Sequence, residues 1–148
     1  YAHLNNGAPG KALRMCEDVI RSNPKAELDP NFASVYWEAL LKEKRIPLLK
    51  EKLQKAVREG SRELAAAAQI QRGHLEKANG KFREALVDGY LRTIVLFKRV
   101  RDAQPEALYN AVVCFKELGQ HTYAEQMRKT LLEEFPRSPY TTKVRAEM

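Results

Sequence analysis

The chain has 148 residues, the length of one ordinary domain, and 44% of them are apolar while 30% are charged. These proportions indicate a globular chain rather than a disordered one, and two Cys exclude a disulfide-dense secreted scaffold. No apolar run is long enough to predict a helix inserted in a membrane. Because the chain begins at Tyr1 and shows no signal-peptide pattern, we expect it to be a piece of a longer protein.

The net charge of +7 is concentrated in the middle of the chain, where residues 42–101 contain sixteen Lys and Arg but seven Asp and Glu. One interpretation is a set of solvated helix faces, since Glu residues are interleaved with the bases and Lys and Arg favour helices. The other is a site for an acidic protein, a phosphate backbone or an anionic membrane surface. The composition leaves both interpretations open.

Apolar residues recur with the helical period along almost the whole chain, and no stretch alternates as a strand does. In the first half, the predicted helices cover residues 11–22, a segment that begins at 30, and residues 47–59. Pro24 ends the first of these, and residues 25–29 are expected to form a loop. Pro30 and Pro47 stand where the first turn of a helix accepts proline.

In the second half, the predicted helices cover residues 61–79, 81–101, 105–118 and 121–135, and another begins at 139. Ser61 is the expected N-cap of the first of these, because a Ser hydroxyl can accept from an orphan backbone N–H. Gly80 and Gly119 each end a helix, and Pro136 stops the helix before it. Connections this short make consecutive helices antiparallel neighbours.

Apolar stripes on these helices identify the residues expected in the core. In the first helix the stripe includes Met15, Cys16 and Val19. Trp37 stands beside the stripe of the second helix and is expected to be partly exposed. Cys16 and Cys114 are interpreted as small buried hydrophobic residues with no reactive role.

One spacing of Gly, a small Ala and a terminal Pro recurs along the chain. The residues that share it are Gly7, Ala12 and Pro24, then Gly80 and Ala85 without a Pro, then Gly119, Ala124 and Pro136. Gly ends one helix in a left-handed conformation, the small Ala lets the next helix approach closely, and Pro stops that helix. The small residue therefore marks the closest contact of each helix pair, and Ala107 serves as a surface position for comparison.

On these residues the chain resembles the tetratricopeptide repeat family. Residues 105–137 follow its pattern of about 34 residues, with matches at Leu108, Ala111, Phe115, Gly119, Ala124, Leu131 and Pro136. The resemblance implies an all-α fold, a right-handed α-solenoid of antiparallel helix pairs that forms one domain over residues 1–148. Its units would cover residues 1–24 (partial), 30–60 (divergent), 61–101, 105–137 and 138–148 (the start of a further helix).

The family's general role implies a non-catalytic interaction or scaffold module that binds a protein or peptide on its concave face. The side of the first helices that would line this groove carries Tyr109, Asn110, Val113, Lys116, Ile70, Gln71, His74 and Lys77. Aromatic, amide, imidazole and ammonium groups together suit a peptide, and the positive side chains favour an acidic one. Tyr109 is the expected main anchor, because a Tyr ring buries a large area and still donates one hydrogen bond.

No pattern predicts a catalytic, cofactor-binding or metal-binding residue. The three His, namely His3, His74 and His121, fall in different units, and no zinc or phosphate-binding motif occurs, so we expect no enzyme activity. One alternative function is the binding of nucleic acid or another polyanion by residues 42–101, although residues 42–81 contain no aromatic side chain to stack on bases. A second alternative is an accessory domain of a larger enzyme or envelope assembly.

Residues 135–140 are similar to repeat junctions common in bacterial proteins of this family. The bacterial cytoplasm, the periplasm and the cell envelope therefore all stay open as locations. The oligomeric state and the identity of the partner stay open as well.

Overall fold

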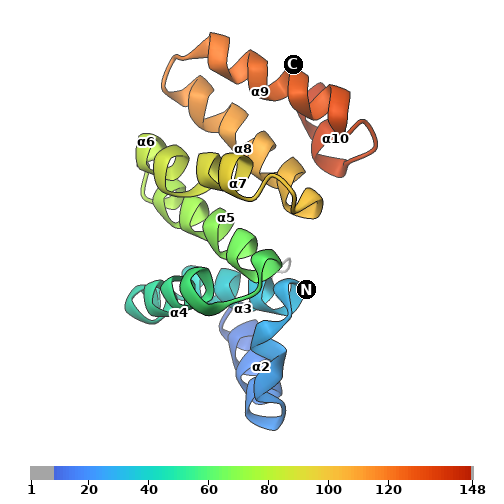
Figure 1. The fold of residues 1–148 in the computed structure, drawn as a ribbon. Helices are drawn as coiled ribbons and strands as arrows, with labels where there is room; N and C mark the ends of the chain where they lie inside the picture. Colours follow the sequence, from blue (N-terminus) through green and yellow to red (C-terminus); the bar gives the residue numbers. More distant parts are fainter. Residues whose placement is uncertain (1–8, 148) are drawn as a thin grey trace. The chain divides into compact units, whose positions relative to one another are not determined.

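The computed structural model describes residues 9–147, and every regular element in that range is a helix. The all-α prediction is therefore confirmed for these residues. The chain divides into two compact units, Tyr1–Gln71 (unit 1) and Arg72–Met148 (unit 2), and helix α5 (Arg62–Ala78) contains the boundary (Figure 1). Two residues used in the sequence argument, His3 and Gly7, lie outside the described residues.

Unit 1 is built from helices joined by short turns. They are α2 (Pro9–Ser22), the 3-10 helix η1 (Pro24–Leu28), α3 (Pro30–Lys42), α4 (Ile46–Glu59) and the N-terminal part of α5. The loop expected at residues 25–29 is thus mostly a 3-10 turn. Helix α3 begins where the Asp29 carboxylate accepts from the N–H of Phe32 at 3.3 Å. Helix α5 begins where the Ser61 hydroxyl accepts from the N–H of Leu64 at 3.1 Å, which confirms the predicted cap.

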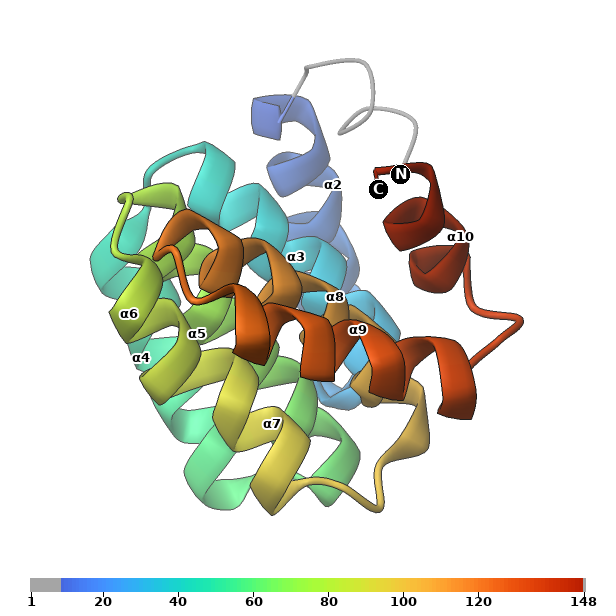
Figure 2. The same ribbon diagram turned by 90° about the horizontal axis from the view of Figure 1, so that it is seen from above.

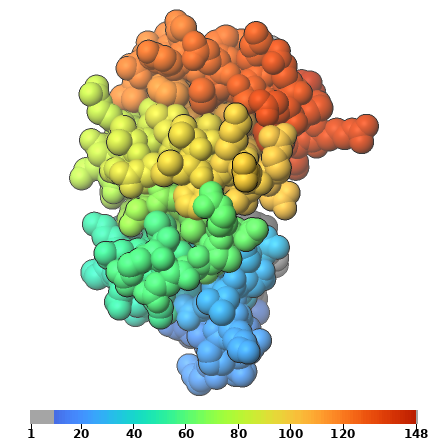
Figure 3. All heavy atoms as spheres, viewed as in Figure 1, coloured from blue at the N-terminus to red at the C-terminus, as the bar shows by residue number. Residues whose placement is uncertain are grey.

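Unit 2 contains the rest of α5 and the elements that follow it. They are α6 (Phe82–Ala85), the π-helical turn η2 (Leu86–Tyr90), α7 (Leu91–Leu96), the 3-10 turn η3 (Arg101–Ala103), α8 (Gln104–Glu117), α9 (His121–Glu134) and α10 (Pro139–Ala146). Helices α8 and α9 form an antiparallel pair, and α10 packs against both of them (Figure 2). On the face viewed in Figure 3, the atoms of this unit form a continuous packed surface.

The helix predicted over residues 81–101 is confirmed from Phe82 to Leu96, and its extension to residue 101 is wrong. This segment is divided into α6, η2 and α7, and the continuous helix stops at Leu96. The buried side chain of Gln104 explains the end, because its amide donates to the carbonyls of Thr93 at 3.1 Å and Phe97 at 2.8 Å. Carbonyls at the end of a helix lack partners within the helix. A side chain from the next helix therefore caps α7, and nothing within the segment itself signals the cap.

Three helix pairs share one turn geometry. The turn residues have positive φ: 57° at Lys44, and 73° at both Gly80 and Gly119. In each turn this residue's N–H donates to the carbonyl three residues back, and the next N–H donates to the carbonyl five residues back, at 2.8–3.0 Å. This is the Schellman arrangement that ends a helix in a left-handed residue. The predicted turns at the two Gly are confirmed, and the divergent segment 30–60 has the same turn at a Lys.

The small and apolar residues that carry the repeat pattern are buried, namely Ala85, Leu108, Ala111, Phe115, Ala124 and Leu131. Both free Cys are buried as well, as predicted. Within the described part of unit 2, Ala107 is also fully buried, because α8 packs against α9, α10 and the elements that precede it, so the prediction of a surface position is wrong.

Two expectations about unit 1 are wrong. Trp37 is 3% exposed rather than partly exposed, because α3 is covered by α2, η1 and α4. Met15 and Val19 are 51% and 44% exposed, because among the described residues α2 packs mainly on α3 and η1, which cover a narrower stripe than the sequence indicates.

Candidate functional site: the polar side of the first helices

Helices α5 and α8 carry the predicted binding residues. We call these two, together with α3 and α10, the first helices. His74 of α5 lies between two polar partners in unit 2: its Nδ1 is 2.6 Å from the Tyr90 hydroxyl, and its Nε2 is 2.8 Å from the Glu106 carboxylate. Tyr90 can come this close because Gly73 has no side chain: a Cβ at Gly73 would lie 2.6 Å from the Tyr90 ring. The histidine therefore links α5 to α8 and to the π-helical turn.

A second polar link joins the same two helices. The Lys77 ammonium donates to the side-chain carbonyl of Asn110 at 2.8 Å, and the Asn110 amide donates to the backbone carbonyl of Glu106 at 2.8 Å. Asn110 is buried, so these hydrogen bonds satisfy polar groups that would otherwise be costly to bury. The predicted residues on α5 and α8 are thus brought together, and they hold the two helices in register.

Tyr109 is buried rather than open to solvent. Its side chain is 7% exposed, and its hydroxyl donates to both carboxylate oxygens of Glu147, at 2.7 and 2.8 Å. The Lys143 ammonium lies 4.8 Å from the Tyr109 ring centre, and the Tyr140 ring lies 5.7 Å away. Burial, together with the Glu147 carboxylate, raises the pKa of Tyr109 to about 12. The role of Tyr109 as an anchor stays a prediction, but its ring is buried in the structure and is not accessible.

Ile70 and Gln71 belong to unit 1, and both are buried. The Gln71 amide donates to the Glu38 carboxylate of α3 at 3.4 Å, so it joins α5 to the preceding first helix. The predicted set is therefore divided between the two units: these two residues lie in unit 1, and the other six lie in unit 2.

Val113 and Lys116 are the predicted residues of α8 that remain accessible. Val113 is half-buried and Lys116 is exposed. No carboxylate among residues 9–147 pairs with the Lys116 ammonium. An apolar side chain and an unpaired cation one helical turn apart form a surface that a partner can reach.

Three of the four links between first helices have a similar sequence separation. It is 33 residues for Gln71 and Glu38, 33 for Lys77 and Asn110, and 32 for His74 and Glu106. The link between Tyr109 and Glu147 spans 38 residues. The three similar values are close to the repeat length of about 34 residues that the sequence pattern indicates.

Sequence reasoning missed six residues that contact the predicted set: Glu38, Tyr90, Glu106, Tyr140, Lys143 and Glu147. The spacing of the last three was a usable signal, because Tyr140, Lys143 and Glu147 recur at helical intervals on the last segment. The sequence of residues 138–148 predicts only the start of a helix, and a helix start alone does not indicate which helix its side chains contact.

The basic segment 42–101 is partly neutralised. Its ion pairs include Lys52 with Glu27 at 2.7 Å and Arg92 with Asp88 at 3.5 Å.

Among residues 9–147, no three His, Cys, Asp or Glu side chains gather so that they could hold a metal ion. Within the same range, no helix combines the length and the apolar character needed to cross a membrane.

Both thiols are poorly suited to reactivity. Burial raises the pKa of Cys16, and it raises the pKa of Cys114 to about 11. A neutral thiol is a weak nucleophile, so neither group is prepared for covalent chemistry at neutral pH.

Comparison of the chain with protein-family models, with curated proteins and with solved structures finds no match.

Proposed function

We propose that this chain is a non-catalytic protein-binding module of the tetratricopeptide type. In unit 2, the side of α8 that carries Val113 and Lys116 binds a partner segment that contains acidic residues. The partner would lie along the first helices α5, α8 and α10, which supply further polar side chains to the same side.

The main support for this proposal is a series of side-chain hydrogen bonds that join first helices about one repeat apart in the sequence. When each repeat contacts its neighbours through the same helix face, the exposed residues beside that face line up from one repeat to the next. Helical repeat proteins commonly bind extended partners along such a surface. The shared Schellman turns at Lys44, Gly80 and Gly119 support the same architecture.

The chemistry of the accessible residues favours an acidic segment. Lys116 is an exposed cation without a carboxylate partner among the described residues, and Val113 offers apolar area beside it. Glu106 and Glu147 face His74 and Tyr109, so these carboxylates are already engaged. A partner carboxylate at Lys116 would therefore gain attraction without competing with Glu106 or Glu147.

Selection of random peptides on the immobilised chain, followed by fluorescence polarisation of the selected peptides, tests this function. We expect acidic sequences, with Kd values that rise with salt because exposed charges are screened beyond about 10 Å at 0.1 M. Val113→Asp and Lys116→Glu should each weaken binding by about 1–3 kcal/mol, because each places a negative charge where the acidic partner lies. Lys129→Glu, at an exposed position of α9, is the matched control and should leave Kd unchanged. Equal loss in Lys116→Glu and Lys129→Glu, or no selected peptide, contradicts the proposal.

A further inference from the structure

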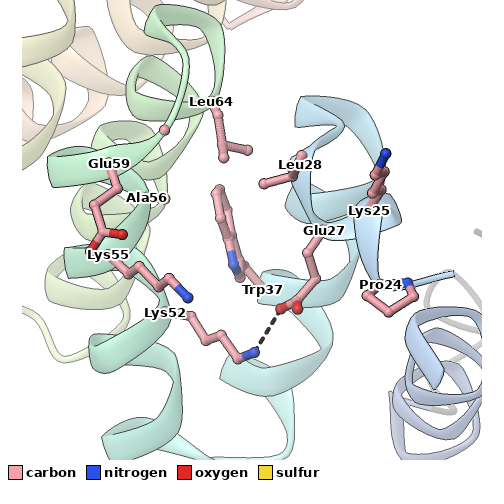
Figure 4. Close-up of a pocket in the computed structure, with 11 residues that line it drawn as sticks. Pro24, Lys25, Glu27, Leu28, Trp37, Lys52, Lys55, Ala56, Glu59 and Leu64 are labelled. Carbon is pink, nitrogen blue, oxygen red and sulfur yellow. Dashed lines mark hydrogen bonds and ion pairs between the residues drawn. The ribbon is translucent and has the colours of Figure 1, made fainter.

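Unit 1 contains a pocket that the proposed function does not use. It has a volume of about 480 Å³ and lies between η1, α4 and the start of α5, with Trp37 of α3 in its wall (Figure 4). Pockets that hold small ligands commonly have volumes of about 300–1,000 Å³. The pocket is therefore large enough for one compact ligand or for one or two residues of a peptide.

One part of the wall is apolar. Leu28 and Leu64 approach the Trp37 ring from different sides in Figure 4, and Ala56 adds a small surface on α4. Leu28 is 62% exposed although it borders a buried indole ring. A large apolar side chain left open beside an aromatic ring favours a ligand with an apolar body.

Among the described residues, none accepts a hydrogen bond from the indole N–H of Trp37, whose side chain is 3% exposed. The indole nitrogen is not closed off from solvent, so this N–H can donate to water. A ligand that enters the pocket can therefore accept the same hydrogen bond. In Figure 4 the indole nitrogen faces the side of the pocket where the Lys52–Glu27 ion pair lies.

The charges around the pocket leave two cations, Lys25 and Lys55, without a carboxylate partner among residues 9–147. Lys52 donates to Glu27 at 2.7 Å, and the Glu59 carboxylate accepts from Arg58 at 2.9 Å, so both carboxylates are engaged. Figure 4 shows the Lys55 ammonium extending from α4 toward the same side as the indole nitrogen. The indole N–H and the Lys55 ammonium thus lie on one side of a pocket whose wall is part apolar and part charged.

We propose that this pocket binds an apolar group that carries a carboxylate, either as a free acid or as the C-terminal residue of a peptide. The carboxylate accepts from Trp37 Nε1–H and from Lys55 Nζ, and the apolar group lies against the indole ring, Leu28 and Leu64. A carboxylate suits this donor pair, because hydrogen bonds between a cation and an anion are stronger than neutral ones.

The chain contains one Trp, so the indole ¹H–¹⁵N resonance of the ¹⁵N-labelled chain reports on this pocket alone. The probes are 4-phenylbutyrate and the peptide acetyl-Gly-Gly-Leu-Phe with a free carboxylate, each compared with its neutral amide. We expect a saturable shift of the Trp37 resonance with at least one acid, and a Kd at least about tenfold higher for its amide. The acid with the lower Kd identifies the source, free or peptide-borne.

A pair of lysine variants separates the pocket from general charge effects. Lys55→Gln should raise the Kd of the acid by about tenfold. Lys50→Gln removes the same charge from another exposed position of α4 that does not line the pocket, and it should change Kd by less than about twofold. The proposal is overturned if neither acid gives a saturable shift, if acid and amide bind equally, or if the two lysine variants raise Kd equally.

Discussion

Lys44 offers the sharpest test of the shared turn, because it holds a left-handed conformation with φ of 57° where the equivalent turns have Gly. That conformation costs a residue with a side chain about 1–2 kcal/mol, whereas glycine adopts it freely. Lys44→Gly removes this cost, but glycine also makes the unfolded chain more flexible. That flexibility lowers the free energy of unfolding by about 0.4–1 kcal/mol and so offsets part of the increase. The variant should therefore raise the free energy of unfolding by about 0.5–1 kcal/mol.

A Lys→Gly substitution at a helical position should change the free energy of unfolding in the opposite direction. Lys50 is exposed within α4, so Lys50→Gly should lower the free energy of unfolding by about 1 kcal/mol. In the reverse direction, Gly119→Ala should lower it by about 1 kcal/mol. No atom lies within 4 Å of the added Cβ at Gly119, so this cost comes from the backbone and not from a clash.

Urea titration followed by Trp37 fluorescence measures the first two effects, because the single Trp and both lysines belong to unit 1. Circular dichroism at 222 nm measures Gly119→Ala in unit 2. A lower midpoint for Lys44→Gly, equal to that of Lys50→Gly, would refute the left-handed turn at residue 44, and the divergent pair would then not share the geometry of the others.

Three further predictions concern unit 2. Ala124→Leu should overpack a buried contact and lower the free energy of unfolding by about 1–3 kcal/mol, whereas Ala78→Leu at an exposed position should have little effect in urea titrations. Since the pKa of Tyr109 is raised to about 12 by burial and by Glu147, its contribution to stability is present below about pH 10 and declines toward pH 12. Tyr109→Phe should flatten this decline in thermal melts, and an unchanged slope would contradict it. Cys114 should resist iodoacetamide at pH 7.5 until urea unfolds the chain, and mass spectrometry of the labelled peptide checks this.

The helical elements were predictable because their signals are local. Gly80 and Gly119 mark left-handed helix ends that glycine alone adopts without cost, and Pro30 and Pro47 mark helix starts. Lys44 was not predictable in the same way, because a lysine has no local reason to adopt positive φ. The surrounding helix pair imposes that conformation, so a sequence pattern that searches for Gly overlooks the turn.

The candidate site was only partly predictable. Helical spacing placed His74, Lys77 and Asn110 on one side of their helices, and the structure brings them together. Their partners depend on tertiary packing: Tyr109 meets Glu147, which is 38 residues away on the last segment. The pocket around Trp37 was not predictable either, because an aromatic residue beside an apolar stripe looks the same whether it closes a core or borders a cavity.

Chemical-shift mapping of a selected acidic peptide onto the ¹⁵N-labelled chain tests the central claim most directly. We expect the perturbed amides of unit 2 to cluster around Val113 and Lys116 on α8 and to extend to the facing residues of α5 and α10. Perturbations confined to α9 or to the turns between helices would contradict the claim, because the first helices would then not be the binding surface.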